Sequence, residues 1–104
     1  MSINALIVES SKYNRKMLES VLTEIGVACV ICQTGSEALA LDNHRQFDFI
    51  IVSRHLDDVG AELFLLCFRE HHLVGNALTI ILTSGAVEEV SFDAKWHALV
   101  VKNL

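Results

Sequence analysis

Proline is absent from this sequence of 104 residues, and basic side chains are few, with 8 Lys and Arg against 13 Asp and Glu. The shortage of basic residues argues against a nucleic-acid partner, because affinity for phosphate backbones comes largely from clustered Lys and Arg. Charged residues are also scarce, at 20% of the chain, and the mean hydropathy is +0.42. This composition excludes a disordered chain, because it supplies enough apolar surface to offset the entropy lost on folding.

Long apolar runs are missing as well. No run approaches the roughly 18–20 residues that span a bilayer, and the first residues lack the basic region and cleavage site of a signal peptide. We therefore expect no membrane partner and a cytoplasmic location. The three cysteines, Cys29, Cys32 and Cys67, cannot all pair, and in a reducing cytosol we expect them to be small buried thiols.

Cys29 and Cys32 form a C-x-x-C motif, which in thioredoxin-like proteins is a redox pair. Here the motif lies inside an apolar run with the pattern of a strand. The period of two in a strand directs positions three apart to opposite faces. We therefore interpret both cysteines as core residues.

The length fits one domain, residues 1–104. Within it, apolar runs alternate with segments of helical periodicity, which is the pattern of a parallel sheet with crossover helices. The uniformly apolar strands indicate that both faces of the sheet are buried. The expected strands cover 5–8, 27–32, 47–53, 77–83 and 98–102, and helices lie between them in a (βα)4β order, the last of them short and weakly patterned at 87–96.

Helix ends are marked in the sequence. Ser10 or Ser11 can cap the first helix, and Gly26 can end it in a left-handed conformation. Thr34 and Glu37 stand at the spacing of a capping box before the second helix.

This order of elements predicts a flavodoxin-like, doubly wound parallel sheet of five strands in the order 2-1-3-4-5 with right-handed crossovers. In such a fold the ligand site lies outside the carboxyl ends of the strands, where the winding reverses. The residues at those strand ends are Glu9, Ser10, Ser53, Thr83 and Lys102.

With these strand-end positions, nearly the whole chain resembles the receiver domain of bacterial two-component response regulators. In that family the first strand ends in two acids, the third in the phosphoacceptor Asp, the fourth in Thr or Ser, and the fifth in Lys-Pro. The resemblance implies a signalling function. The equivalent positions here are Glu9 and Ser10 for the acidic pair, Ser53 for the phosphoacceptor, Thr83 for the hydroxyl and Lys102 for the lysine.

The departures from the family pattern bear on its chemistry. A serine hydroxyl with no base beside it is a poor nucleophile, so Ser53 is not expected to accept a phosphoryl group. Ser10 removes a second acid, and Glu9 alone is expected to bind Mg²⁺ weakly or not at all, because Mg²⁺ gives up its waters reluctantly. We therefore expect no metal site, no cofactor and no enzyme. Without a phosphoryl group, Thr83 and Lys102 become a strand-end hydroxyl and a counter-ion for Glu9.

The loop after Ser53 offers further polar candidates for the vacated pocket. Asp57 and Asp58 could lend a carboxylate to it, although adjacent acids in a polar loop are usually solvated. His55 lies two residues past Ser53 and could reach the pocket or remain a polar surface residue.

These features favour a degenerate receiver domain that acts as a phosphorylation-independent protein-interaction module in bacterial signalling. The alternative is a domain that senses a small ligand or an anion in the vacated pocket, where Ser10, Ser53, Thr83 and Lys102 are donors. A third interpretation is a conventional receiver domain whose acids have been replaced by substitution.

Receiver domains continue into a fifth helix that covers the sheet beside the first helix, whereas only two residues follow the last expected strand here. We expect a fold without that fifth helix and with an uncovered apolar strip on the same face, and such strips mark interfaces. The chain is then either a piece of a longer protein, with other domains as its partners, or a dimer that buries the strip between subunits.

Overall fold

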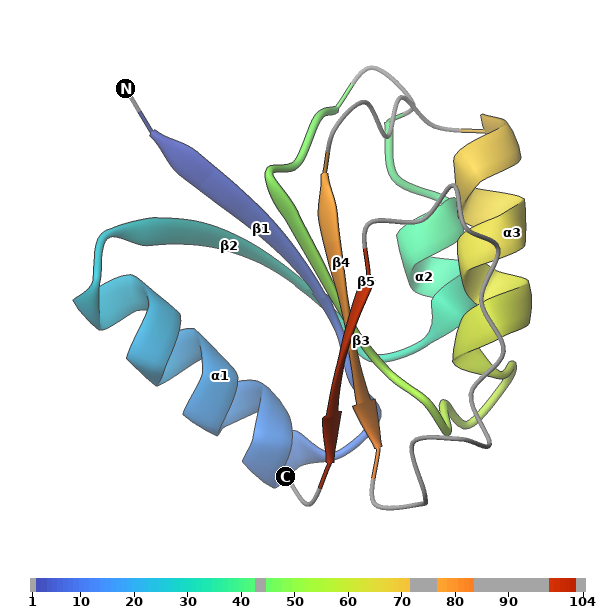
Figure 1. The fold of residues 1–104 in the computed structure, drawn as a ribbon, viewed down its shortest axis with the longest axis horizontal. Helices are drawn as coiled ribbons and strands as arrows, with labels where there is room; N and C mark the ends of the chain where they lie inside the picture. Colours follow the sequence, from blue (N-terminus) through green and yellow to red (C-terminus); the bar gives the residue numbers. More distant parts are fainter. Residues whose placement is uncertain (1, 43–44, 72–76, 84–97, 103–104) are drawn as a thin grey trace.

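The described part of the chain contains five strands and three helices (Figure 1). The computed structural model describes residues 2–42, 45–71 and 77–83 together with the backbone of 98–102. The short helix expected at 87–96 lies outside these residues. The elements are β1 (Ile3–Val8), α1 (Lys12–Glu24), β2 (Val27–Cys32), α2 (Gly35–Leu39), β3 (Phe49–Ser53), α3 (Ala61–His71), β4 (Leu78–Thr83) and β5 (Ala98–Lys102).

All five strands form one parallel sheet in the order β2-β1-β3-β4-β5, which confirms the doubly wound arrangement expected from the sequence. The third strand begins two residues later than expected, at Phe49. The preceding residue, Asp48, instead joins the segment before β3 to β1: its backbone N–H donates to the Asn4 carbonyl at 2.8 Å, and its carboxylate accepts from the Asn4 N–H at 2.8 Å.

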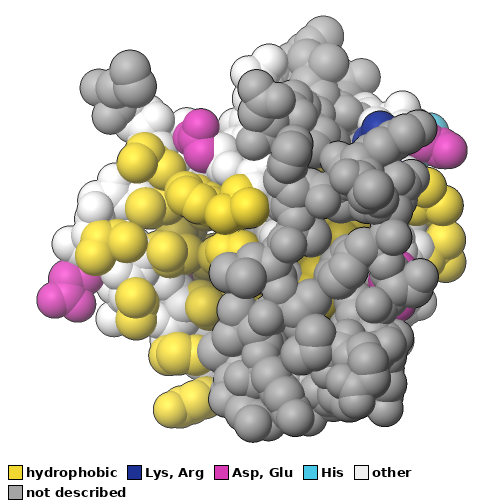
Figure 2. All heavy atoms as spheres, in the orientation of Figure 1, with side chains coloured by type: hydrophobic (Ala, Val, Ile, Leu, Met, Phe, Trp, Pro, Cys, Tyr) yellow, Lys and Arg dark blue, Asp and Glu magenta, His cyan; other side chains and the backbone are white. Residues whose placement is uncertain are grey.

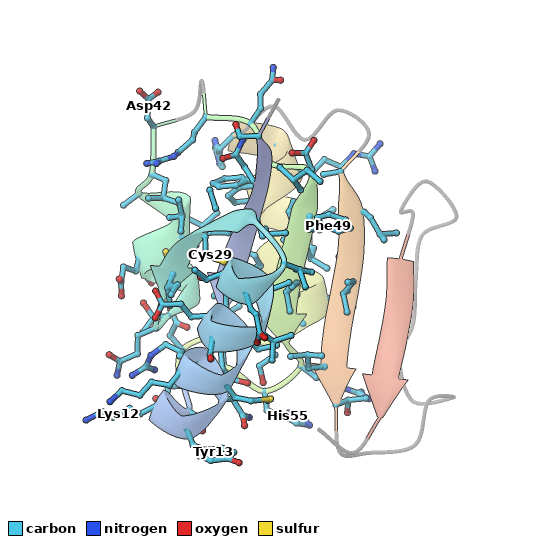
Figure 3. The ribbon with its side chains drawn as sticks, turned by 90° about the vertical axis from the view of Figure 1, so that its left-hand side faces the viewer. Lys12, Tyr13, Cys29, Asp42, Phe49 and His55 are labelled. Carbon is cyan, nitrogen blue, oxygen red and sulfur yellow. The ribbon has the colours of Figure 1, made fainter. Side chains whose placement is uncertain are left out.

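Helices cover both faces of the sheet, α1 on one and α2 with α3 on the other (Figures 1 and 3). The face toward α2 and α3 carries the main core. Phe64 and Phe68, one turn apart on α3, are fully buried there with ring centroids 5.4 Å apart. The buried members of this cluster are Leu6, Val8, Cys32, Ala38, Phe47, Ile50, Val52, Leu56, Ala61, Phe64, Leu65, Phe68, Ala77 and Ile81.

The face toward α1 has a smaller core. Its buried residues are Ile7, Ile51 and Leu82, against which Leu18 and Leu22 of α1 pack without being fully buried. The apolar spacing of α1 also includes Val21 and Ile25, but both are more than half exposed. The sequence therefore places an apolar side on this helix that the described residues leave partly uncovered.

The helix ends follow the predicted signals. Ser11 caps α1, because its Oγ accepts a hydrogen bond from the Asn14 N–H at 3.3 Å, and Gly26 follows α1 with φ of +91°. Thr34 caps α2, its Oγ1 accepting from the Glu37 N–H at 3.1 Å. The Glu37 carboxylate accepts a hydrogen bond from the Gln33 N–H at 3.2 Å. In the usual capping box the donor is the N–H of the cap residue itself, which here would be Thr34.

The cysteines are all free, but the expectation that they are all buried is wrong for two of them. Cys32 is buried, whereas Cys29 and Cys67 are only half-buried. Cys29 belongs to the α1 side of the sheet and Cys32 to the opposite side, as the strand period predicts. Among the described helices, none is long and apolar enough to cross a membrane.

Candidate functional site

The carboxyl ends of the strands meet at one edge of the sheet. Because Val8 pairs with Val52, and Ser53 with Leu82, the chain after β1 lies beside the ends of β3 and β4. Thr83, buried at the end of β4, pairs through its backbone with Lys102 of β5. The structure therefore brings the backbones of all five predicted strand-end positions to the same edge. His55 lies at this end of the molecule (Figure 3).

Glu9 lies at this edge directly after β1, and it is only 3% exposed. Its carboxylate accepts two hydrogen bonds from the start of α1, one from the Ser11 N–H at 3.0 Å and one from the Asn14 side-chain amide at 3.1 Å. The Arg15 guanidinium donates to the backbone carbonyls of Glu9 and Ser10, at 2.9 and 2.8 Å. Both carboxylate oxygens of Glu9 therefore hold the β1–α1 turn.

The side chain of Ser10, unlike that of Glu9, contacts loops far away in the sequence. Its hydroxyl donates to the Gln33 carbonyl at 3.1 Å and accepts from the Asp57 N–H at 3.0 Å. This single side chain connects the chain after β1 to the loop after β2 and to the loop after β3. Ser10 is thus a clamp between three segments, and both its donor and one of its acceptor positions are occupied.

The loop after β3 is fastened at several points. The Arg54 N–H donates to the Leu82 carbonyl at 2.8 Å, and exposed His55 forms an isolated antiparallel bridge with Gly60. Asp57 is exposed, and its backbone N–H donates a hydrogen bond to the Ser10 hydroxyl at the end of β1. The structure thus places these loop residues beside the strand ends while the loop itself is held in place.

Asp58 points to the start of α2. Its Oδ1 accepts from the Gly35 N–H at 3.0 Å, and its Oδ2 accepts from the N–H and the hydroxyl of Ser36, both at 2.8 Å. The hydrogen bond from the Ser36 N–H, followed by those from the Ser36 hydroxyl and the Gly35 N–H, lowers the pKa of Asp58 below its ordinary value. The carboxylate of Asp58 therefore binds the start of α2.

Gly35 allows this close approach. A Cβ placed there would lie 2.6 Å from Cγ1 of Val59 and 3.2 Å from a ring carbon of Phe64. The loop after β3 thus presses on the backbone at the start of α2, where a side chain would obstruct it.

The fold raises the question of whether this edge could hold Mg²⁺. That ion requires several oxygen ligands, and carboxylates usually supply them. Ser10 and Ser53 are neutral, and both oxygens of Glu9 already accept hydrogen bonds from the chain. Within residues 2–42, 45–71 and 77–83, no group of three or more His, Cys, Asp or Glu side chains could hold a metal. The described residues therefore do not fit the ion.

Comparison with solved structures decides the fold. A CheY-like response regulator receiver domain from Methylobacillus flagellatus superimposes with a TM-score of 0.84 at 15% identity, over 98% of this chain and 86% of that chain. The chain has the receiver fold. A receiver domain protein from Bacillus halodurans shares this fold, with a TM-score of 0.79 at 18% identity over 98% of this chain and 84% of that one.

A third receiver-fold protein carries chemical information. It is a response regulator from Burkholderia pseudomallei, solved with a phosphorylated aspartic acid, a calcium ion and citrate. Its TM-score is 0.71 at 24% identity, and the match covers 82% of this chain and 49% of that one. No protein-family sequence model matches the chain, and no curated protein sequence matches it. Identities this low establish the receiver fold alone.

Sequence reasoning placed the strand-end residues of the receiver fold but missed the contacts they make. It did not find that Ser10 joins three segments, or that Asp58 binds the start of α2. The partners of these side chains lie 22 to 47 residues away in the sequence. Local sequence patterns carry no signal for such contacts.

Proposed function

We propose that this chain is a degenerate receiver domain that works as a protein-interaction module in bacterial signalling without being phosphorylated. The proposal depends most on one observation, the double hydrogen bond of the Ser10 hydroxyl to Gln33 and Asp57. At a position where the family has a metal-binding acid, this chain has a neutral side chain that is committed to structure. Ser53, the half-buried equivalent of the phosphoacceptor, is neutral as well.

The contrast with the Burkholderia pseudomallei protein supports this proposal. That protein carries a phosphorylated aspartic acid and a calcium ion. A phosphoryl group needs a carboxylate to form the acyl phosphate and a cation to neutralise its charge. The strand ends of this chain present serines at two of the three acidic positions. We infer a domain that is not an enzyme and whose partners are proteins, whether separate chains or other domains.

Three free cysteines are compatible with a reducing compartment, and we propose the cytoplasm.

The ligand-sensing alternative has one donor fewer than the sequence suggested, because the Ser10 hydroxyl already donates to Gln33. We therefore favour the interaction module.

Beryllofluoride with Mg²⁺, which mimics a phosphoryl group on an aspartate, tests the proposal directly. We expect the amide NMR spectrum of the protein to stay unchanged on its addition. Large shifts around Ser53, or a stable adduct with acetyl phosphate, would contradict the proposal. The matched control is the double variant Ser10→Asp with Ser53→Asp, whose response would indicate a scaffold that remains competent for the ordinary chemistry. A thermal shift with inorganic phosphate or nucleotides would favour the ligand-sensing alternative.

A further inference from the structure

Helix α1 has an apolar stripe that the described residues leave exposed. Tyr13, Met17 and Val21 follow one another at intervals of four residues, and Ile25 continues the series at the C-cap. Residues four apart on a helix lie on one side of it. Tyr13 is 77% exposed, Ile25 70% and Val21 52%, while Met17 is half-buried. Figure 2 shows hydrophobic side chains gathered along α1 and onto the adjoining sheet.

The helix is also the weakly held layer of the fold. None of its thirteen residues is fully buried, whereas α3 buries Ala61, Phe64, Leu65 and Phe68. Solvent-exposed apolar stripes of this kind are typical of association surfaces. The position of the stripe on a single helix limits the contact to about 20 Å, because a helix rises about 1.5 Å per residue.

The stripe can pack against the stripe of a second, antiparallel copy of α1. If two copies of α1 lie antiparallel about a two-fold axis, Tyr13 faces Ile25 of the other copy and Met17 faces Val21. A two-fold axis uses the same surface on both chains, so each contact occurs twice.

Charges beside the stripe fit the same arrangement. Exposed Lys16 and Glu24 lie in the helical row next to the stripe, near its opposite ends. Antiparallel pairing brings Lys16 of each copy toward Glu24 of the other. The helix carries three basic and two acidic residues, so its net charge is only +1, whereas the whole chain has a net charge of −5. Unlike charges at the rim of an interface select orientation and partner.

We propose that the α1 stripe binds the α1 stripe of a second copy of this chain in an antiparallel pair. The inference rests on the proposed interaction function and names its partner. A contact of one helix per subunit belongs to the small end of protein interfaces, so the dimer dissociates readily on dilution.

Sedimentation velocity over a range of concentrations measures this association. We expect Val21→Asp to raise the dissociation constant by about tenfold or more, because it places a charge in the centre of the stripe. Leu63→Asp is the matched control, because Leu63 is 55% exposed on α3, across the sheet from α1. It should leave the dissociation constant unchanged, and circular dichroism checks that both variants are folded.

A charge exchange gives a second test that does not depend on the apolar residues. Lys16→Glu alone and Glu24→Lys alone should each weaken the dimer, because each places like charges together twice. The two substitutions combined should restore the wild-type dissociation constant, since the pair is re-formed with reversed signs.

Several outcomes would overturn the inference. A wild-type protein that is monomeric at all concentrations would leave the stripe to a different chain. A dimer that is lost with Leu63→Asp and kept with Val21→Asp would place the interface on α3, and failure of the charge exchange to restore association would exclude the antiparallel pair. In each case, an NMR spectrum that does not respond to beryllofluoride would leave the proposed phosphorylation-independent function standing, so the two failures can be told apart.

Discussion

At the scale of single residues, a serine at position 10 can form contacts that an acid cannot. The Ser10 hydroxyl donates to the Gln33 carbonyl and accepts from the Asp57 N–H. An ionised carboxylate only accepts hydrogen bonds, so it would meet the Gln33 carbonyl without a proton to share. The Ser10 hydroxyl therefore connects three loops in a way that an acid at this position could not.

Asp58 provides a prediction about pH. Its pKa is lowered in the folded protein, chiefly by the Ser36 N–H, so the charged carboxylate stabilises the fold above the pKa of the unfolded chain. That contribution is lost as the pH falls through the folded pKa. We expect Asp58→Asn to lower the urea midpoint at about pH 7, and we expect the difference from wild type to shrink as the pH falls below the pKa of the unfolded chain and through the lowered pKa of the folded protein.

Asp57→Asn is the control for this experiment. Among the described residues, the Asp57 carboxylate accepts no hydrogen bond, and its contact with Ser10 is made by the backbone N–H. We expect Asp57→Asn to leave the urea midpoint nearly unchanged throughout this pH range. A destabilisation by Asp58→Asn that is the same in acid as at neutral pH would contradict the assigned role of the Asp58 charge.

At the scale of elements, the β3–α3 loop and the start of α2 are built around each other. Asp58 binds the first two N–H groups of α2, and Val59 lies over the α carbon of Gly35. A helix of five residues has little stability of its own, because most of its N–H and C=O groups have no partner within it. Contacts from the loop therefore supply much of what holds α2 in place.

Gly35→Ala tests this contact. An alanine Cβ would lie 2.6 Å from Cγ1 of Val59, so we expect a loss of about 1–3 kcal/mol in the free energy of unfolding, as for other overpacked sites. This loss opposes the gain of about 1 kcal/mol that alanine normally gives over glycine within a helix. Urea unfolding gives the measurement.

Two further variants make the Gly35 result specific. Gly60→Ala is the control, because no atom lies within 4 Å of its Cβ position, and it should change stability by less than about 1 kcal/mol. Adding Val59→Ala to Gly35→Ala should recover part of the loss, since it removes the obstructing methyl group. If Gly35→Ala is as stable as Gly60→Ala, the close approach does not constrain the fold.

The elements also show what the sequence could and could not predict. The strands were predictable because each contains an apolar run, and Gly26 and one of the two serines at 10 and 11 marked the limits of α1 through local chemistry. The carboxyl-end edge followed from the parallel topology. The bonds of Ser10 and Asp58 could not be predicted, because they depend on how loops far apart in the sequence are brought together. Periodicity likewise predicted the apolar side of α1 but not how much of it is covered.

At the scale of the whole molecule, the two layers on the sheet are unequal. In the described residues, fourteen buried apolar side chains form the core toward α2 and α3, whereas three form the core toward α1. Hydrophobic burial is the main favourable contribution to folding, at roughly 25 cal/mol per Å² of apolar surface. The α1 layer should therefore separate from the sheet at a lower cost than α3 does.

Native-state hydrogen exchange measures that difference residue by residue. We expect the amides of α1 around Leu18 and Leu22 to exchange through a local opening, with a free energy well below that of the β1 and β3 amides. The amides of Phe64 and Phe68 on α3 should exchange close to the global free energy of unfolding, because their side chains are fully buried. Equal protection of α1 and α3 would contradict the unequal layers.

The same measurement separates the strength of α1 packing from self-association. In dilute Lys16→Glu protein, where the proposed dimer is weakened, α1 should show the low protection of the isolated subunit. In concentrated wild-type protein, its protection should rise with concentration, because a second copy binds only the closed helix and so lowers the population of the open state. Protection of Leu6 in β1 is the internal reference, since this buried strand residue faces α2 and α3. If α1 protection is high in the dilute variant and does not depend on concentration, the contacts within one chain are sufficient to hold the helix.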